Sequence, residues 1–238
     1  KHDTFATFFV VGELLEFQPE IFDKIIDNDH EIAFHTMHHE RLDSPGFKEN
    51  FSDEIKKFAK LTKHKSQGFR APTFSLNQSS SWVIDVLAEN NYIYDSSIIP
   101  AKSNMYGTPN AEHSPYRISS NSIEKNDSSG KLIEFPLLTT RFLGKKIPAA
   151  GGFYLRTLPT NVIKNAIKNY EKKGMPATFY IHSWELTPEF MPRLDLPLKD
   201  KFVTYHNLDK AYSRMSELLK HFEFTSFGRY IEENKMIR

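Results

Sequence analysis

Stretches with β-strand character alternate with amphipathic helical stretches along most of this chain, and the links between them are short. The predicted strands cover 4–12, 31–35, 67–72 and 92–97, and the predicted helices cover 18–29, 52–64 and 79–91. Strands separated by helices in this way pair in parallel through βαβ units. The alternation therefore predicts an α/β fold, either a (β/α) barrel or a doubly wound sheet.

Residues at the ends of the first stretches support these predictions. Residues 4–12 are mostly apolar and end at Gly12, which is typical of a strand buried on both faces. Pro19 suits the first turn of the next helix, where Phe22, Ile25 and Ile26 form an apolar stripe at helical spacing. Ser52 is a favoured N-cap residue and marks the predicted start of the helix after that.

The alternation stops at 101–130, where Asn, Ser, Gly and Pro dominate, so we expect a long surface excursion with room for a hairpin. It then resumes, with strands predicted at 131–137, 177–186 and 223–227 and helices at 160–173 and 208–222. We expect residues 188–238 to form a C-terminal extension that packs on the barrel. No linker divides the chain, so 1–238 is predicted to be a single domain.

Composition excludes several classes of function. Lys and Arg number 31 against 30 Asp and Glu, which gives a net charge of +1 and no basic surface for nucleic acid. The chain has no Cys, so disulfides and thiolate metal sites are excluded. No apolar run approaches the roughly 20 residues of a membrane span. Aromatic residues make up 13%, which suits an enzyme core or a platform for sugars.

Four predicted strands end at a residue with catalytic or metal-binding chemistry: His35, Arg70, Asp95 and His182. The carboxyl ends of the strands of a parallel barrel share one face, and active sites lie there. His39 follows His35 by four residues, but an isolated His pair is more often structural than ligating. The four strand ends together favour a functional site.

The same residues lie in segments that resemble a known family. The segments are "ATFFVVG", "DHEIAFHTMHH", "GFRAPTFSL", "YIYDSSIIP", "EFPL", "AAGGFYLRTLP", "FYIHSWEL" and the closing "YHNLDKAYSRMSELLKHFEFTSF". In this order they resemble polysaccharide deacetylases of the NodB-homology type, carbohydrate esterase family 4, and most of all the branch associated with exosortase and exopolysaccharide loci. The resemblance extends over essentially the whole chain.

The resemblance implies a distorted (β/α) barrel and metal-dependent removal of N-acetyl groups from the amino sugars of a polysaccharide or its precursor. It assigns His35 and His39 as ligands of a divalent metal, zinc first, with Co, Ni or Fe as alternatives. It assigns His182 as the general acid and Asp95 as the residue that orients it and tunes its charge. Arg70 would hold a carboxylate base.

Four further residues are candidates for substrate contacts. Phe74 and Trp184 suit stacking on a sugar ring, although core packing explains them equally well. Gly151 and Gly152 would let a loop approach the substrate, although a plain turn explains them nearly as well.

One family motif has no match. The acidic motif that supplies the base and the third metal ligand closes a strand, and we expect that strand to lie before Lys1. The chain is then either a fragment of a longer protein or a reduced pseudoenzyme. Its cellular location is expected to be either the cytoplasm or the cell envelope. Two alternative functions stay open, an allantoinase-like hydrolase of small amides and a non-catalytic glycan-binding protein.

Overall fold

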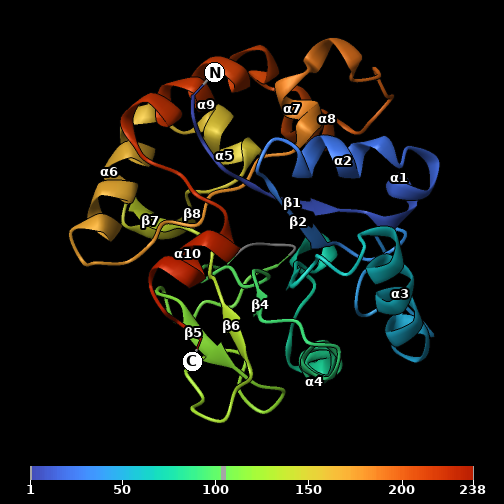
Figure 1. Ribbon diagram of the computed structural model, residues 1–238. Helices are drawn as coiled ribbons and strands as arrows, with labels where there is room; N and C mark the ends of the chain where they lie inside the picture. Colours follow the sequence, from blue (N-terminus) through green and yellow to red (C-terminus); the bar gives the residue numbers. More distant parts are fainter. Residues whose placement is uncertain (1, 103–105, 238) are drawn as a thin grey trace.

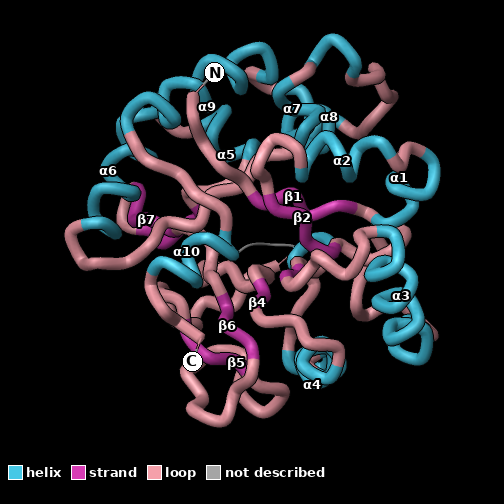
Figure 2. The backbone as a smooth tube through the Cα atoms, viewed as in Figure 1, coloured by secondary structure: helices cyan, strands magenta, loops and turns pink. Residues whose placement is uncertain are grey.

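Six strands form one sheet in the order β1–β2–β3–β4–β6–β5, in a computed structural model that describes residues 2–102 and 106–237 (Figure 1 and Figure 2). β1 to β4 and β6 run parallel, and β5 pairs antiparallel with β6 at the edge. The bounds are β1 Thr7–Val10, β2 Glu31–Phe34, β3 Gly68–Phe69, β4 Tyr94–Asp95, β5 Tyr116–Ile118 and β6 Leu132–Glu134. The predicted α/β fold with a parallel sheet is confirmed.

The parallel arrangement continues beyond β6. Leu137 forms a parallel bridge with Thr178, and the backbone N–H of Leu138 donates to the Thr178 carbonyl, so the segment 177–181 lies beside the chain that leaves β6. Within the described residues no ladder joins 177–181 to β1, so the barrel is distorted rather than a closed ring of hydrogen bonds. A separate hairpin consists of β7 Thr139–Phe142 and β8 Lys145–Pro148.

Helices surround the strands. Figure 1 shows α1 to α4 beside β1 to β4, and α5, α6 and α9 grouped on the other side. The helices are α1 Gly12–Phe17, α2 Glu20–Ile26, α3 Phe47–Leu61, α4 Trp82–Glu89, α5 Gly152–Thr157, α6 Thr160–Glu171, α7 Ser183–Leu186, α8 Leu198–Tyr205, α9 Ala211–His221 and α10 Phe227–Glu233. Short 3-10 turns lie at Pro72–Phe74, Gln78–Ser80, Pro188–Phe190 and Leu208–Lys210. None of the described helices has the length and apolar character needed to cross a membrane.

Aromatic side chains join the sheet to its outer helices. Phe34 of β2 is fully buried, and its ring centroid lies 6.0 Å from that of Phe51 and 4.7 Å from that of Phe58, both in α3. Phe69 of β3 contacts Phe34 and Phe51. Burying a side chain of this size contributes ~1.5–3 kcal/mol. This packing fixes the end of β2, and therefore the place where His35 leaves it.

A second aromatic cluster fills the barrel interior at the end where the strands begin. Phe227, the first residue of α10, contacts Phe9 and Tyr94 with centroid distances of 5.8 and 5.1 Å. The Tyr94 hydroxyl donates to Glu31, the first residue of β2, and Glu31 also accepts from the backbone N–H of Gly228. Because these groups occupy this end, a ligand site is expected at the opposite end, where the strands finish.

The first strand differs from its prediction. β1 covers only Thr7–Val10, and Gly12 begins α1 instead of closing the strand. Phe8 is 42% exposed, so the strand is not buried on both faces. β1 pairs only with β2 within the described residues, and an edge strand has less cover than a central one. The helix predicted at 52–64 also differs, because α3 begins at Phe47 instead of Ser52.

Two predicted strands are wrong. The stretch 177–186 forms only the Thr178 bridge and then turns into α7, and 223–227 leads into α10 without pairing. A short apolar run reads the same whether its backbone pairs in a sheet or only packs against one. The predictions at 160–173 and 208–222 are confirmed by α6 and by a 3-10 turn followed by α9.

The predicted excursion at 101–130 includes β5, which pairs back on β6. Residues 103–105 of that stretch lie outside the described residues.

Candidate functional site

A tightly held loop follows β2 and carries the paired histidines. Thr36 and His39 have left-handed backbone conformations, with φ of 61° and 56°, which cost energy for residues other than Gly. The carbonyl of Thr36 accepts from the backbone N–H of Gly12, and its hydroxyl accepts from the backbone N–H of Glu40. Because several hydrogen bonds hold the strained residues, the loop is rigid where the two rings leave it.

The rings of His35 and His39 lie edge to face. Their centroids lie 4.9 Å apart with 71° between the planes. Nδ1 of His35 lies 2.7 Å from the carbonyl oxygen of Arg70, so that nitrogen donates and Nε2 carries the free lone pair. Burial lowers the pKa of His35 to about 3, against a smaller opposing effect of the bond to the Arg70 carbonyl. Partial burial also lowers the pKa of His39, so both rings are neutral at pH 7.

These two rings fit part of a metal site. Two imidazoles on one tetrahedral zinc ion would place their ring centroids about 5 Å apart. The observed 4.9 Å agrees with that, and the bond from Nδ1 of His35 to a backbone carbonyl is the usual support for a ligating His. Within residues 2–102 and 106–237, however, no group of three or more His, Cys, Asp or Glu side chains gathers around one point. The described residues therefore supply two ligands and not a complete set.

Arg70 follows β3 and is buried beside this pair. Its Nε donates to the Ser96 carbonyl at 2.8 Å and its Nη2 to the Ser96 hydroxyl at 2.7 Å, while the guanidinium lies 4.1 Å from the centre of the Phe9 ring. Burial lowers the pKa of Arg70 to about 10, which leaves it charged at pH 7. In the described part of the chain no carboxylate forms a direct ion pair with it, although the charges of Asp95 and Glu134 raise its pKa against the effect of burial. A buried cation of this kind favours an anionic group nearby.

His182 lies at the N-cap of α7 and is about half exposed. Its Nδ1 lies 3.2 Å from Oε2 of Glu185, and its ring stacks on Trp184 with 17° between the planes. A protonated His182 lowers the pKa of both His35 and His39, so its ring is within electrostatic reach of the pair. The structure therefore brings His182 to the same end of the barrel as the two paired histidines.

Asp95 lies on the other face of the sheet. Tyr94 points into the interior, and successive residues of a strand point to opposite faces. Asp95 accepts from the Ser97 hydroxyl at 2.6 Å and lies in register with Glu134 of β6. Burial raises the pKa of both carboxyls. In the described residues Asp95 does not bond His182, so the predicted contact between them is not formed, and the carboxylate beside His182 is Glu185.

The predicted substrate-contact residues have identifiable neighbours within the protein. Phe74 is half-buried and its ring contacts that of Tyr180 at 5.1 Å, while Trp184 covers His182. A Cβ at Gly152 would overlap the carboxylate of Glu185, and one at Gly151, where φ is 94°, would meet the Tyr180 ring. The two glycines thus make room for side chains of this protein.

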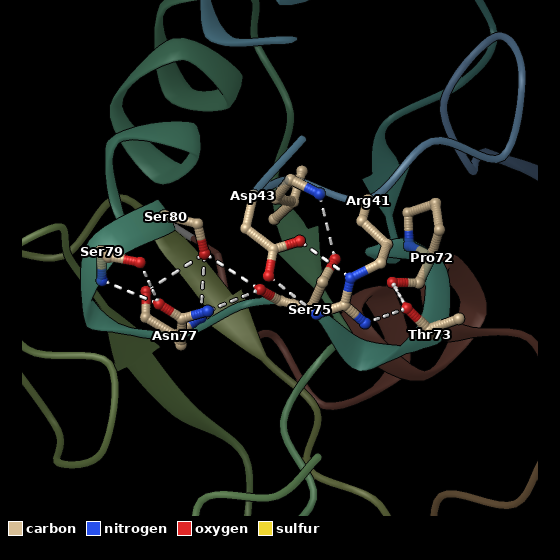
Figure 3. A network of polar contacts seen from close by, with 9 residues as sticks. Arg41, Asp43, Pro72, Thr73, Ser75, Asn77, Ser79 and Ser80 are labelled. Atoms are coloured by element: carbon tan, nitrogen blue, oxygen red, sulfur yellow. Dashed lines mark hydrogen bonds and ion pairs between the residues drawn. The ribbon is translucent and has the colours of Figure 1, made fainter. Parts of the chain in front are cut away.

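The loops after β2 and β3 are tied to one another at this end of the barrel. Figure 3 shows Arg41 between Asp43 and Thr73, and the backbone N–H of Leu42 donates to the Ser75 hydroxyl at 3.1 Å. Nη1 of Arg41 donates to the Thr73 hydroxyl at 2.6 Å. The loop that carries His39 and the loop that follows Arg70 therefore hold each other in place.

Sequence reasoning missed Glu185 and Arg156. They form a buried ion pair with Nε of Arg156 3.1 Å from Oε1 of Glu185. The only sequence signal is the spacing in "HSWE", which places Glu185 three residues after His182 and suits a helix N-terminus. Nothing in the sequence connects Arg156, 29 residues before Glu185, with that motif.

The fold occurs in solved structures. A Mycobacterium smegmatis protein assigned to the polysaccharide deacetylases is 17% identical with a TM-score of 0.56, and the match covers 98% of this chain and 72% of that one. The Puue allantoinase is 16% identical with a TM-score of 0.55, and the match covers 94% of this chain and 64% of that one. At these identities the likeness shows the fold alone, and it confirms the barrel of the NodB deacetylase type.

Family models match nearly the whole chain, whereas no curated protein matches it. Residues 1–92 match the model described as "Polysaccharide deacetylase". Residues 96–232, more than half of the chain, match the model described as "Domain of unknown function (DUF3473)". The protein therefore belongs to the DUF3473 family, and its first 92 residues place it in the polysaccharide deacetylase superfamily.

Proposed function

We propose that this protein hydrolyses the N-acetyl groups of amino sugars in a polysaccharide or its precursor, in a metal-dependent reaction. The single observation that carries the proposal is the close pair of neutral imidazoles, His35 and His39, with a third ring, His182, within electrostatic reach of both. The match of residues 1–92 to polysaccharide deacetylases supports the same chemistry. We favour an exopolysaccharide as the substrate, because the chain most resembles the branch of the family associated with exopolysaccharide loci.

His35 and His39 would hold the metal, His35 through Nε2, which the bond from Nδ1 to the Arg70 carbonyl leaves free. Zinc suits neutral imidazoles best, with Co, Ni or Fe as alternatives. A bound divalent ion would polarise the acetamide carbonyl and acidify water. His182 would give a proton from Nε2 to the leaving amine as the C–N bond breaks. Phe74 and Trp184 would contribute aromatic surface for the sugar.

The proposal also needs a carboxylate base and a third metal ligand, and the described residues do not place them beside His35. The buried charge of Arg70 supports such a group at this position, because Asp95 and Glu134 act on Arg70 only electrostatically and neither forms a direct ion pair with it among the described residues. We therefore propose that a carboxylate from outside residues 1–238 completes the site. Two protein ligands fall short of the three that catalytic zinc sites use.

A non-catalytic glycan-binding role is the second candidate, and this shortage of ligands is the observation that favours it. Such a protein would bind N-acetylated oligosaccharides at the same end of the barrel and release no acetate. Release of acetate distinguishes the two functions.

Acetate release from N-acetylglucosamine oligomers, followed by mass spectrometry with and without chelator, tests the proposal. We expect acetate loss that the chelator stops and that Zn²⁺ restores in a longer chain that includes upstream sequence, where the gene encodes it, and poor turnover in this chain alone, because it supplies two metal ligands and no base. His182→Ala should keep the metal and lower turnover by ~10²–10⁴. Binding of the oligomers without acetate loss in either chain would establish the glycan-binding alternative.

A further inference from the structure

A buried ion pair lies directly behind the ring of His182. Arg156 in α5 and Glu185 in α7 each have 1% of their side chain exposed, and Nε of Arg156 lies 3.1 Å from Oε1 of Glu185. The other two nitrogens of Arg156 donate to backbone carbonyls, Nη1 to His206 at 2.6 Å and Nη2 to Val203 at 3.0 Å. With every nitrogen of the guanidinium engaged, Arg156 is held in one position and presents Nε to the carboxylate.

The second oxygen of Glu185 faces His182. Oε2 accepts from the backbone N–H of His182 at 3.1 Å and lies 3.2 Å from Nδ1 of its ring. Gly152 contacts the carboxylate on a further side, where a Cβ would overlap it. Burial by itself raises the pKa of Glu185, but the hydrogen bonds from His182 and the charge of Arg156 outweigh it, and the pKa lies below its usual range. Glu185 is therefore a charged acceptor with a fixed position.

We propose that Glu185, held by Arg156, is the positioning residue for His182 and sets both its ring orientation and its tautomer. A charged carboxylate can only accept, so Nδ1 of the neutral ring carries the proton and Nε2 is left free for a ligand. This takes the place of the role expected for Asp95, which lies on the other face of the sheet.

The catalytic consequence rests on the proposed deacetylation. When the C–N bond of the acetamide breaks, its electron pair goes to the nitrogen, which takes the proton from Nε2 of the imidazolium. The carbon keeps the oxygen gained from water and leaves as acetate. The ring returns to the neutral form with its proton on Nδ1, the form that Oε2 of Glu185 stabilises.

Glu185→Gln tests this because it changes one oxygen to an NH2 group at nearly constant size. Arg156 can only donate, so the amide oxygen would face Arg156 and the NH2 group would face His182. That NH2 group would lose the bond from the backbone N–H of His182 and would also meet the proton on Nδ1. The neutral ring relieves the second conflict by carrying its proton on Nε2. In that tautomer Nδ1 is bare, whereas the ring that has just given its Nε2 proton to the amine must keep a proton on Nδ1.

The tautomer is measured directly from the ring ¹⁵N shifts of uniformly labelled protein, at a pH where the rings are neutral. The His182 signals are assigned by their loss in His182→Gln. We expect the Nδ1–H tautomer in the wild type and the Nε2–H tautomer in Glu185→Gln. Glu31→Gln is the matched control, because Glu31 also accepts three hydrogen bonds but is the first residue of β2, at the end of the barrel away from His35 and His182. It should leave the His182 signals unchanged.

An Nε2–H tautomer in the wild type overturns the inference without any variant, and so does an unchanged tautomer in Glu185→Gln. In an active protein, Glu185→Gln should lower kcat by ~10²–10⁴ with little change in KM. If no acetate is released but the tautomer changes as expected, the positioning stands and the proposed deacetylation fails. If turnover and tautomer both survive the substitution, the deacetylation stands and the positioning fails.

Discussion

The buried carboxyl pair of Asp95 and Glu134 should make the stability of this protein fall as pH rises, and Glu134→Gln should remove that dependence. The two residues are 1% and 0% exposed, and Oδ2 of Asp95 and Oε2 of Glu134 have no other hydrogen-bond partner among the described residues. The side chains are close enough to bond one another through a shared proton. One proton between them satisfies both oxygens and removes one of two adjacent buried charges.

The magnitude follows from proton linkage. Burial, then the charge of Asp95, raises the pKa of Glu134 well above its usual range, so the folded protein keeps a proton that the unfolded chain has lost. For an acid with a raised folded pKa, the stabilisation is complete below the unfolded pKa near 4.3 and is lost as pH rises through the folded pKa. One proton corresponds to ~1.4 kcal/mol per pH unit. Between about pH 5 and about pH 7 the wild type should lose up to ~2.7 kcal/mol relative to Glu134→Gln.

Urea unfolding at several pH values measures this difference. In the wild type the backbone N–H of Ile98 donates to Oε1 of Glu134 at 2.9 Å. In Glu134→Gln the amide oxygen can still accept this bond, and the NH2 group can donate to Asp95. We therefore expect a folded variant with an unchanged m-value and a flatter pH profile. Glu217→Gln, in a surface ion pair with Lys164, is the control and should keep the wild-type slope. Parallel profiles for the wild type and Glu134→Gln would refute the shared proton.

Three further predictions concern the site and the core. His35→Ala should abolish Zn²⁺ binding in calorimetry. The Zn²⁺ affinity of the wild type should change little above about pH 6.5, because His35 and His39 are already neutral. A Zn²⁺ affinity that depends strongly on pH above that value would contradict the lowered pKa values of the two residues. Gly152→Ala should lower stability by ~1–3 kcal/mol, since its Cβ would overlap the carboxylate behind His182, and unchanged thermal unfolding would contradict that packing. Phe227→Ala should cost ~3–5 kcal/mol, against little for Phe17→Ala at a side chain that is 77% exposed; equal losses would show that the interior cluster contributes no stability.

Sequence reasoning succeeded where a residue's position depends on its own strand. His35 follows an apolar strand whose burial is visible in its composition, so its emergence at the carboxyl end of β2 could be predicted. Arg70 follows in the same way from β3, where Pro72 ends the extended stretch. The spacing from His35 to His39 also placed the two rings together.

It failed where the outcome depends on which face a short strand presents. β4 has only two residues, Tyr94 and Asp95, and its alternation is too brief to show which one enters the barrel. The Tyr94 ring takes the interior because Gly68 leaves room for it, so Asp95 is directed away from His182. Glu185 was missed for a different reason, because its partner Arg156 is distant in sequence and only tertiary packing joins them.

The docking of α10 into the barrel has a consequence for the order in which the chain folds. The backbone N–H of Phe227 donates to the hydroxyl of Thr7 at 3.0 Å, a contact between residues 220 positions apart. During synthesis, Phe9 and Tyr94 leave the ribosome long before the ring that covers them in the interior. The nascent barrel therefore exposes these interior rings until α10 is made, which favours aggregation of chains that have not yet reached it.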